Sequence, residues 1–507
     1  MKKLWKKLLA VTTAVMMAIT LLPAMANANA TDGKGTVTII KNGEKSDEFL
    51  AGAKFSFYKI ASITNSEGKD WKYTVEEAYR KQLGDNGAAK NLNNLPSSAW
   101  EAEIDVLAAI NATAIKESEA SAEMTGSTGA TELPLGVYLV KETTTPAGYV
   151  ASKPFIVSVP STNNYDTAGK EGTEFIYDIT AKPKNSKMSV DKTIVNEDKT
   201  AYIGGFVEYK VETQIPKYGT EYTNPVFNIY DKMSNGLSFV NDEAHKLKVF
   251  VGGTEIVEGE NTYTLATNGL SDEKTFEIQF AKAFLENKEN KGKKVEVTYY
   301  AQVNENAVYI NENSANITYQ NKPGETTDAT PSKKNVYTYG IDLTKNGDKS
   351  ADADGLDGAE FTLAAANGEM ISILVNGTKV DVNGNSKDKF RTTTVGNKKG
   401  KLVFKGLKAG TYTLTETKSP SGYSLAKNPI TIVITANKDG SFASATVNET
   451  TVTNDVKDGI VPVGLQNKSG FSLPATGGMG TYLFTIGGLV IMAGAALLLI
   501  ASRKRRA

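Results

Sequence analysis

The sequence predicts an all-β protein of three tandem β-sandwich domains of immunoglobulin-like type, with a helical insertion in the first domain. Most segments are short runs of alternating apolar and polar residues, rich in Val, Ile, Thr and Tyr and separated by Gly, Asn and Asp. Many short strands with frequent turn signals are typical of β-sandwiches. The 507 residues exceed what one hydrophobic core supports, and one block pattern occurs twice.

The strand-like segments run through the whole chain, and one region between them is helical in pattern. Clear strand segments are Thr36–Lys41, Lys54–Ile60, Gly136–Glu142, Phe206–Thr213, Lys293–Val303 and Gly410–Glu416. Helices are expected over Val75–Leu83 and Ser98–Ser118. In the second of these, apolar residues recur on one helical face; they are Trp100, Ile104, Leu107, Ala108 and Ile115.

Residues 1–30 are predicted to be a secretory signal peptide. Lys2, Lys3, Lys6 and Lys7 precede an apolar run, and small residues up to Ala30 follow it. A charged start, a short apolar stretch and an A-x-A-like site are typical of a cleaved leader. The chain is therefore expected to be secreted.

The other end carries a pentapeptide, an apolar segment and a basic tail in that order. The pentapeptide is Leu473, Pro474, Ala475, Thr476 and Gly477. Tyr482–Ala501 has no charge and is long enough to span a bilayer, and the tail at 503–506 is basic. This order resembles the cell-wall sorting signal read by sortases. The resemblance implies cleavage between Thr476 and Gly477, transfer of Thr476 to an amine, and anchoring to the cell wall.

Composition excludes several classes of function. Lys+Arg and Asp+Glu both number 57, so no basic field indicates a nucleic-acid partner. With no cysteine and one histidine, His245, the chain lacks the residues of thiolate or multi-histidine metal sites. Asp352, Asp354 and Asp357 lack the spacing of an EF-hand loop and are interpreted as an acidic turn. We expect no metal and no cofactor.

Two sets of sequence blocks occur in the same order near the two ends of the chain. The matching pairs are Leu50–Phe55 with Leu356–Phe361, Gly136–Thr143 with Gly410–Thr417, and Pro146–Tyr149 with Pro420–Tyr423. These blocks resemble the CnaB-type domain of Gram-positive surface proteins, and the Glu-Thr-x-x-Pro-x-Gly-Tyr stretch resembles its E-box. The middle third, with Phe227–Met233, resembles the CnaA-like domain of backbone pilins.

These observations divide the chain into five parts. They are a signal peptide at 1–30, a CnaB-like domain at 31–185, a CnaA-like domain at 186–335, a CnaB-like domain at 336–458 and a sorting signal at 459–507. The Pro-, Gly- and Thr-rich piece Asn321–Lys334 is expected to be the linker into the third domain.

Strand parity predicts that each domain buries one lysine, one carboxylate and one asparagine, because residues two apart face the same side of a strand. The predicted sets are Lys41, Glu142 and Asn185; Lys192, Asp231 and Asn313; and Lys345, Glu416 and Asn454. In the middle domain Asn316 is an alternative to Asn313.

Burial of these groups favours a neutral amine and a protonated carboxyl. A neutral amine is a nucleophile, and a protonated carboxyl can polarise an amide and pass a proton to leaving ammonia. Buried ion pairs alone would also satisfy the pattern. The resemblance to CnaA and CnaB domains implies that each set forms a Lys–Asn isopeptide bond, with Glu142, Asp231 and Glu416 as the autocatalytic acids.

One exposed lysine is the expected acceptor for polymerisation. The stretch Phe175–Asn185 resembles the pilin motif WxxxVxVYPK, with Pro183-Lys184 at the conserved place. Lys184 has the opposite parity to Asn185 and should face solvent. Lys182 is the alternative nucleophile.

The resemblance therefore implies a structural protein and not an enzyme: the shaft subunit of a covalent pilus, polymerised by a sortase from Lys184 to Thr476. Its partners would be pilus-specific and housekeeping sortases, identical subunits joined head to tail, minor pilins and peptidoglycan, with host surface ligands left open. The alternatives are a monomeric wall-anchored adhesin, a minor pilin at the tip or base, and a surface enzyme.

Overall fold

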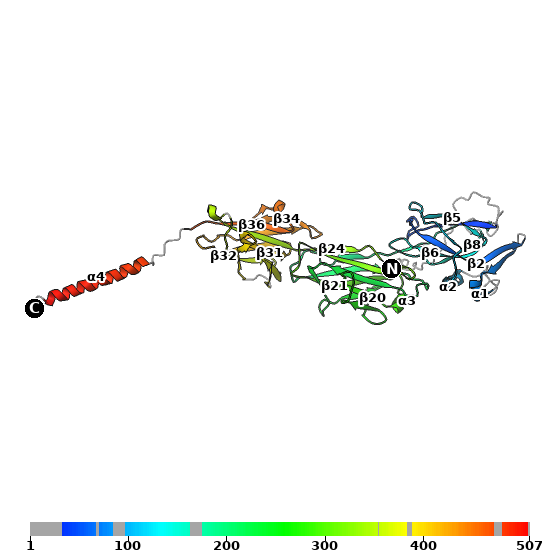
Figure 1. The fold of residues 1–507 in the computed structure, drawn as a ribbon, viewed down its shortest axis with the longest axis horizontal. Helices are drawn as coiled ribbons and strands as arrows, with labels where there is room; N and C mark the ends of the chain where they lie inside the picture. The colour runs from blue at the N-terminus through cyan, green and yellow to red at the C-terminus, as the bar shows by residue number, and fades with distance from the viewer. Residues whose placement is uncertain are drawn as a thin grey trace, which may run out of the picture. The chain divides into compact units, whose positions relative to one another are not determined.

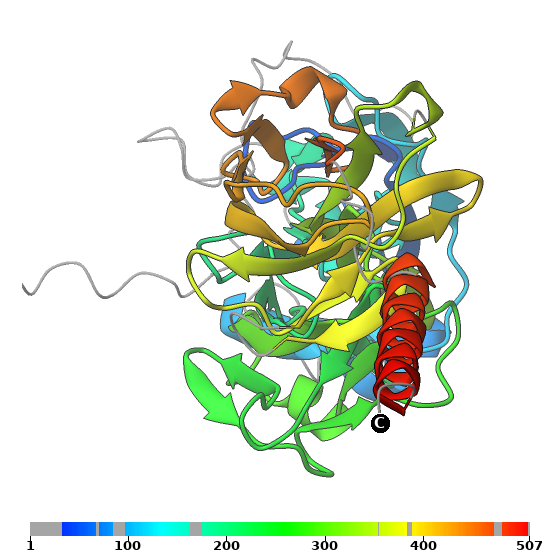
Figure 2. The same ribbon diagram turned by 90° about the vertical axis from the view of Figure 1, so that its left-hand side faces the viewer.

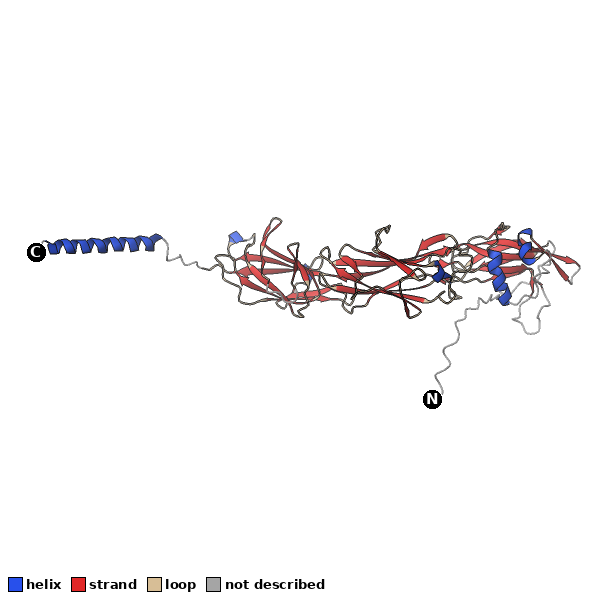
Figure 3. Ribbon diagram, turned by 90° about the horizontal axis from the view of Figure 1, so that it is seen from below, coloured by secondary structure: helices blue, strands red, loops and turns tan. Residues whose placement is uncertain are grey.

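The computed structural model describes residues 33–66, 70–84, 97–162, 175–352, 354–382, 388–470 and 479–504. The predicted signal peptide and the LPATG pentapeptide lie outside these residues. Strands dominate the described chain, and the helices are few (Figure 3). The described residues form two compact units. One holds the residues up to Lys199 with Phe206–Asn306 and Asn311–Val336, and the other holds Thr200–Gly205, Ala307–Ile310 and the residues from Tyr337 on.

The first β-sandwich packs a three-stranded sheet against a larger one. The first sheet has the order β11 (Asp178–Ala181), β1 (Lys34–Ile40), β5 (Ser127–Pro134). The second has the order β3 (Asp70–Val75), β2 (Lys54–Ser66), β6 (Gly136–Thr144), β8 (Phe155–Val159), with β4 (Lys116–Glu117) paired to β2. Two short ladders join β9 (Ser161–Thr162) to β10 (Phe175–Ile176) and β7 (Tyr149–Val150) to β12 (Ser186–Lys187). Buried residues of both sheets, such as Ile39 and Tyr138, form one core.

The predicted helical insertion covers the outer face of the larger sheet. Helices α1 (Glu77–Leu83) and α2 (Ser97–Ala108) lie near β2 and β6 (Figure 1). Their residues Tyr79, Leu83 and Leu107 are buried in one apolar cluster with residues of β2 and β6. The expected continuation of the second helix to Ser118 is wrong. Lys141 Nζ donates a 2.6 Å hydrogen bond to the carbonyl of Ala108, a cation at the helix C-terminus. The chain then pairs with β2, leaving Ile115 exposed.

The second sandwich also has two sheets. One has the order β13 (Asp191–Ile194), β14 (Phe206–Gln214), β21 (Lys294–Val303), β17 (Lys248–Val251), β18 (Thr254–Ile256), with β16 (Leu237–Val240) on β21. The other has the order β19 (Tyr263–Ala266), β20 (Phe276–Phe280), β15 (Phe227–Met233), β22 (Ile310–Lys322), β23 (Glu325–Asp328), with β24 (Ser332–Tyr337) on β22. The Phe276 and Tyr299 rings meet edge to face across this core, 4.9 Å apart. A short helix, α3 (Lys282–Glu286), follows β20.

The stretch Asn321–Lys334 is not a plain linker. It completes β22, forms β23 and begins β24, because its Thr-rich part pairs with β22 across a Gly324 turn at φ +82°. The strand propensity of Thr therefore outweighs the turn signals of Pro and Gly here.

The third sandwich can be followed in the yellow to orange strands of Figure 2. One sheet has the order β28 (Thr378–Asp381), β27 (Ser372–Val375), β31 (Lys398–Leu407), β25 (Tyr339–Gly347), β36 (Ile460–Asn467), with β30 (Thr393–Val395) on β31. The other has the order β29 (Phe390–Arg391), β26 (Glu360–Ala365), β32 (Gly410–Lys418), β33 (Ile430–Ala436), β34 (Phe442–Val447), β35 (Thr450–Thr451). Short 3-10 turns occupy Ser350–Asp352 and Thr453–Asp455. The predicted boundary at residue 458 is too early, since β36 pairs with β25.

The predicted membrane-spanning segment falls within α4 (Met479–Lys504). Side chains are described only for residues 485–497 of this helix. Within the described part of the chain, no helix is long and apolar enough to cross a membrane.

Candidate functional site: buried lysine–acid–asparagine sets

In the first sandwich, one carboxylate bridges a buried amine and a buried amide. Lys41 Nζ lies 2.9 Å from Glu142 Oε2, and both side chains are fully buried. Asn185 Nδ2 donates a 2.8 Å hydrogen bond to Glu142 Oε1. Ser152 holds the same carboxylate from its backbone N–H and its hydroxyl, at 2.8 and 2.9 Å. Burial lowers the pKa of Lys41, and the nearby Glu142 charge opposes that shift.

Parallel pairing of the first and last strands brings the lysine and the asparagine together. Strand β1 pairs in parallel with β11, and an isolated bridge continues this ladder from Asn42 to Lys184. The Asn185 backbone N–H donates to the carbonyl of Asn42 at 3.0 Å. The predicted set of Lys41, Glu142 and Asn185 is thus brought together.

The middle sandwich contains a set with a fourth member. Lys192 Nζ lies 2.5 Å from Asp231 Oδ2 in the interior. The Tyr299 hydroxyl donates to the same Oδ2 at 2.5 Å and contacts Lys192 Nζ. Asn313 Nδ2 donates to the Tyr299 hydroxyl at 3.2 Å. Asn316 instead donates to Tyr230 at 3.1 Å, so Asn313, and not Asn316, shares the Tyr299 hydroxyl with the lysine.

Burial dominates the electrostatics of this set. It lowers the pKa of Lys192 to about 8, against the pull of Asp231. It raises the pKa of Asp231 and moves the pKa of Tyr299 well above its ordinary value. Both shifts of the Lys–Asp pair favour the neutral amine and the protonated carboxyl.

In the third sandwich the predicted asparagine is the wrong one. Asn454 is exposed on the Thr453–Asp455 turn. Asn467, the last residue of β36, is buried and donates to both oxygens of Glu416, at 2.8 and 2.9 Å. Residues 450–454 form only the short edge strand β35 and a turn. The last strand of the domain is β36, further along the chain. Asn454 therefore follows an edge strand and not the last strand of the domain.

Lys345 lies in the same interior region. It is fully buried, and its Nζ donates to the carbonyls of Asn346 and Leu465 at 2.8 and 3.3 Å. In the parallel ladder of β25 and β36, Lys345 pairs with Leu465 and Gly347 with Asn467. Asn467 therefore stands two residues beyond the lysine along this ladder.

The first and third sandwiches share three further features around their sets. Each lysine begins a Lys-Asn-Gly triplet, at 41–43 and 345–347. Each glutamate accepts a backbone N–H from ten residues further along, from Ser152 and from Ala426. Gly126 and Gly400 have positive φ, and a Cβ on either would collide with the carbonyl of the lysine. This agreement supports Asn467 as the equivalent of Asn185.

All three asparagines share an unsatisfied oxygen. Among the described residues, the buried Oδ1 atoms of Asn185, Asn313 and Asn467 accept no hydrogen bond. A buried polar atom without a partner is costly and uncommon in folded proteins. Each amide is therefore held through its nitrogen alone.

Lys184, the lysine predicted to be the polymerisation acceptor, is exposed as expected. Its Nζ donates to the Ser46 hydroxyl at 3.1 Å, and the neighbouring Asn185 is buried. Lys182 is half-buried. Thr476 lies outside the described residues.

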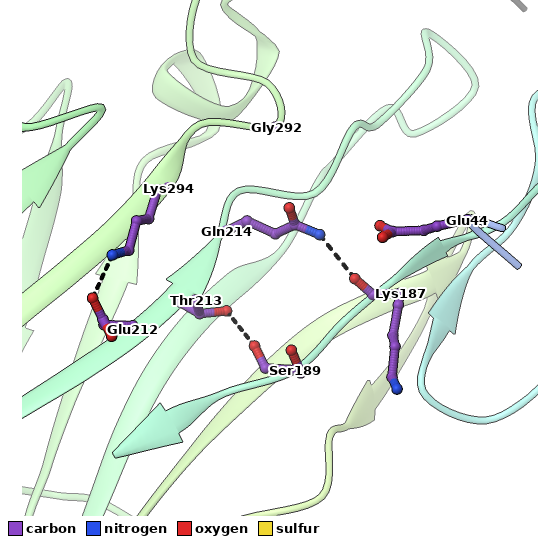
Figure 4. Close-up of a pocket in the computed structure, with 8 residues that line it drawn as sticks. All are labelled: Glu44, Lys187, Ser189, Glu212, Thr213, Gln214, Gly292 and Lys294. Carbon is purple, nitrogen blue, oxygen red and sulfur yellow. Dashed lines mark hydrogen bonds and ion pairs between the residues drawn. The ribbon is translucent and has the colours of Figure 1, made fainter. Parts of the chain in front are cut away.

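A polar hollow of about 370 Å³ lies apart from these sets (Figure 4). Gln214 Nε2 donates to the carbonyl of Lys187 at 2.9 Å along its wall, and Lys294 pairs with Glu212. None of the buried lysine–acid–asparagine residues lines this hollow. His245 stacks on Phe206, and its Nδ1 lies 3.0 Å from the Asp242 carboxylate oxygen near the surface. Within the described ranges, no cluster of acidic and histidine side chains could hold a metal.

Comparison with known proteins agrees with this architecture. A model of a prealbumin-like fold domain matches residues 35–173 and 341–451. A model of a Gram-positive pilin backbone subunit, described as a Cna-B-like domain, matches residues 203–323. The middle domain, expected to be CnaA-like, thus matches a model that is described as Cna-B-like. A model of the LPXTG cell wall anchor motif matches residues 466–507.

Similar proteins come from several Gram-positive bacteria. The chain is 28% identical over 492 residues to fimbrial subunit type 2 of Actinomyces naeslundii, covering 89% of this chain and 82% of that protein. The T6 backbone pilin of Streptococcus pyogenes, described as a modular three-domain structure, has a TM-score of 0.57 at 19% identity, over 87% of this chain and 100% of that one. The major pilin SpaA of Corynebacterium diphtheriae has a TM-score of 0.51 at 20% identity, over 86% and 100%.

The sandwiches and the C-terminal motif define a surface protein that is anchored to the cell wall. Within that class, the chain belongs to the Gram-positive backbone pilins, the structural subunits of fimbriae.

Proposed function

We propose that this chain is the shaft subunit of a covalent pilus and that each of its three domains is cross-linked internally by one Lys–Asn amide bond. The bonds would join Lys41 to Asn185, Lys192 to Asn313, and Lys345 to Asn467. The observation that carries the proposal is the carboxylate of Glu142, which contacts both the Lys41 amine and the Asn185 amide in a dry interior. The SpaA structure is described as a modular assembly with stabilising isopeptide bonds, which supports the same interpretation here.

The chemistry needs only groups that the chain supplies. A neutral lysine Nζ attacks the asparagine Cγ, and the amide nitrogen leaves as ammonia. The acid takes the proton lost by Nζ and gives a proton to the leaving nitrogen. In the middle domain, burial favours both the neutral Lys192 amine and the protonated Asp231 carboxyl. Since the chain has no cysteine, these amides would take the place of disulfides in a secreted protein.

Polymerisation would use Lys184, at the end of the first domain, and the C-terminus of the mature chain. A pilus-specific sortase would cleave after Thr476 and transfer its carbonyl to Lys184 of another copy, giving a head-to-tail amide. Lys184 suits this role because it is exposed and beside a strand held by the Asn185 amide. A housekeeping sortase would attach the last subunit to peptidoglycan, and minor pilins would complete the fibre.

The test is the high-molecular-weight ladder of cell-wall extracts on denaturing gels. Lys184→Ala should abolish the ladder while monomer is still secreted and anchored, and the matched variant Lys182→Ala should keep it. Tandem mass spectrometry of the polymer should find the branched peptide that joins Lys184 to Thr476. A ladder that survives Lys184→Ala, with the branch at Lys182, would assign the acceptor to Lys182. No ladder from the unaltered chain with its own sortase would favour the monomeric adhesin.

A further inference from the structure

The middle sandwich differs from the other two in how its acid reaches the asparagine. In the first and third sandwiches, the asparagine Nδ2 donates directly to a glutamate. In the middle one the acid is Asp231, which is one methylene shorter than glutamate. Asn313 Nδ2 donates to the Tyr299 hydroxyl, and that hydroxyl donates to Asp231. The Tyr299 hydroxyl thus lies between the acid and the amide, where a longer acid side chain would contact the amide directly.

Tyr299 is held rigidly at this place. It lies in β21, its side chain is fully buried, and its ring packs edge to face on Phe276. Lys192 Nζ lies 5.0 Å from the centre of the Tyr299 ring and 4.7 Å from that of Tyr209. The one hydroxyl therefore contacts the amine, the acid and the amide of the set.

We propose that Tyr299 is a catalytic residue of the middle domain, which relays a proton between Asp231 and the leaving nitrogen of Asn313 and positions that amide. This inference rests on the proposed function, because it assigns a role within the same bond-forming reaction. No corresponding tyrosine contacts Glu142 or Glu416 in the hydrogen bonds of the described chain.

The proton transfers balance through the hydroxyl. Lys192 Nζ forms a bond to Asn313 Cγ and passes one proton to the unprotonated oxygen of the Asp231 carboxyl group. Asp231 in turn gives a proton to the Tyr299 oxygen, and the Tyr299 hydroxyl proton moves to Asn313 Nδ2. The Cγ–Nδ2 bond then breaks and ammonia leaves. Asp231 and Tyr299 end in the protonation states in which they began.

The experiment counts bonds domain by domain in the full chain. Protein harvested at intervals after a pulse of synthesis is digested, and mass spectrometry quantifies the three branched peptides. Tyr299→Phe keeps the ring and removes the hydroxyl. It should lower the rate of the Lys192–Asn313 branch by about a hundredfold, the typical size of a lost proton-transfer group. The Lys41–Asn185 and Lys345–Asn467 branches should form as in the unaltered chain.

The matched control is Tyr319→Phe. Tyr319 lies in β22, and its buried hydroxyl makes no hydrogen bond to Lys192, Asp231 or Asn313 in the described structure. All three branches should therefore form normally in this variant. Formation of the Lys192–Asn313 branch at the unaltered rate in Tyr299→Phe would overturn the proposal. Absence of every branch from the unaltered chain would instead overturn the proposed function.

A second variant separates catalysis from folding. Asp231→Glu with Tyr299→Phe restores the missing methylene and imitates the direct contact of the other two domains. If Tyr299→Phe makes the middle domain sensitive to protease, recovery of the branch in the double variant supports the relay. A double variant that folds but stays unlinked overturns it.

Discussion

Asn467 donates a hydrogen bond from Nδ2 to each oxygen of the Glu416 carboxylate, at 2.8 and 2.9 Å, in the interior of the third sandwich. The asparagine ends the last strand of its sheet, and Gly347 of the first strand lies opposite it. Asn454, which the sequence indicated for this role, is exposed on a turn. This pair of asparagines provides a direct test of the third bond.

Replacing Asn467 should remove one bond, and replacing Asn454 should remove none. Each amide bond expels ammonia, so the mature protein should weigh about 17 Da less per bond than its sequence mass, or about 51 Da in all. Asn467→Ala should reduce the deficit to about 34 Da, because the third domain loses its acceptor. Intact-mass spectrometry measures both variants. A deficit that changes in Asn454→Ala and not in Asn467→Ala would reverse the assignment.

Loss of the first bond should destabilise the first domain. Asn185→Ala removes the acceptor but leaves the ion pair of Lys41 with Glu142 in place. A covalent tie between the first and last strands restricts the unfolded chain as a disulfide does, which amounts to about 4 kcal/mol for a long loop. The unfolding midpoint of this domain should fall by on the order of 10 °C, measured by calorimetry.

The control for this stability change is Lys34→Ala. Lys34 forms a 2.7 Å ion pair with Glu132 in the same domain, but both side chains are more than half exposed. Exposed ion pairs contribute little to stability, so the midpoint should hardly move. Equal midpoints for Asn185→Ala and the unaltered protein would argue against the first bond.

The unlinked middle domain should become more stable as pH rises above about 8. In Asn313→Ala no amide can form, and Lys192 stays a buried amine. Its pKa of about 8 in the folded chain lies below the ordinary 10.5. Between these values the unfolded chain binds more protons, so the free energy of unfolding rises with pH across this window and is lowest below it. Denaturant unfolding at several pH values gives the slope.

Other lysines also titrate in this range, so a reference variant is needed. Lys192→Met with Asp231→Asn lacks both charges and is unlinked as well. Subtracting its unfolding free energy isolates the buried pair. A difference that falls with rising pH would contradict the lowered pKa of Lys192.

Most of the buried sets could be predicted because strand parity is a strong constraint. Met188, Val190, Lys192 and Ile194 alternate with exposed or half-buried neighbours, and the structure buries all four. Strand parity also predicts that Asn467 is buried. Val461, Val463 and Asn467 share parity in β36, as Ile179, Ala181 and Asn185 do in the first domain. The predicted end of the third domain at residue 458 excludes β36, which pairs in parallel with β25.

Two features could not be predicted from local sequence. The role of Tyr299 depends on which tyrosine of β21 reaches Lys192 on β13 of its own sheet and Asp231 on β15 of the opposite sheet. This follows from the pairing of distant strands. At the end of α2, the carbonyl of Ala108 accepts a hydrogen bond from Lys141, which is distant in sequence. Periodicity describes one segment at a time, and contacts between segments decided both features.

The adjacency of exposed Lys184 and buried Asn185 has a mechanical consequence. If subunits are joined through Lys184 and Thr476, a pull along the fibre enters each copy after the first sandwich and leaves at its C-terminus. The first sandwich would then lie outside the part of the chain that transmits the force, and it would bear no load. In the other two, the amides at Lys192 and Lys345 would carry the force across each fold, so that the strands between could not unravel under traction.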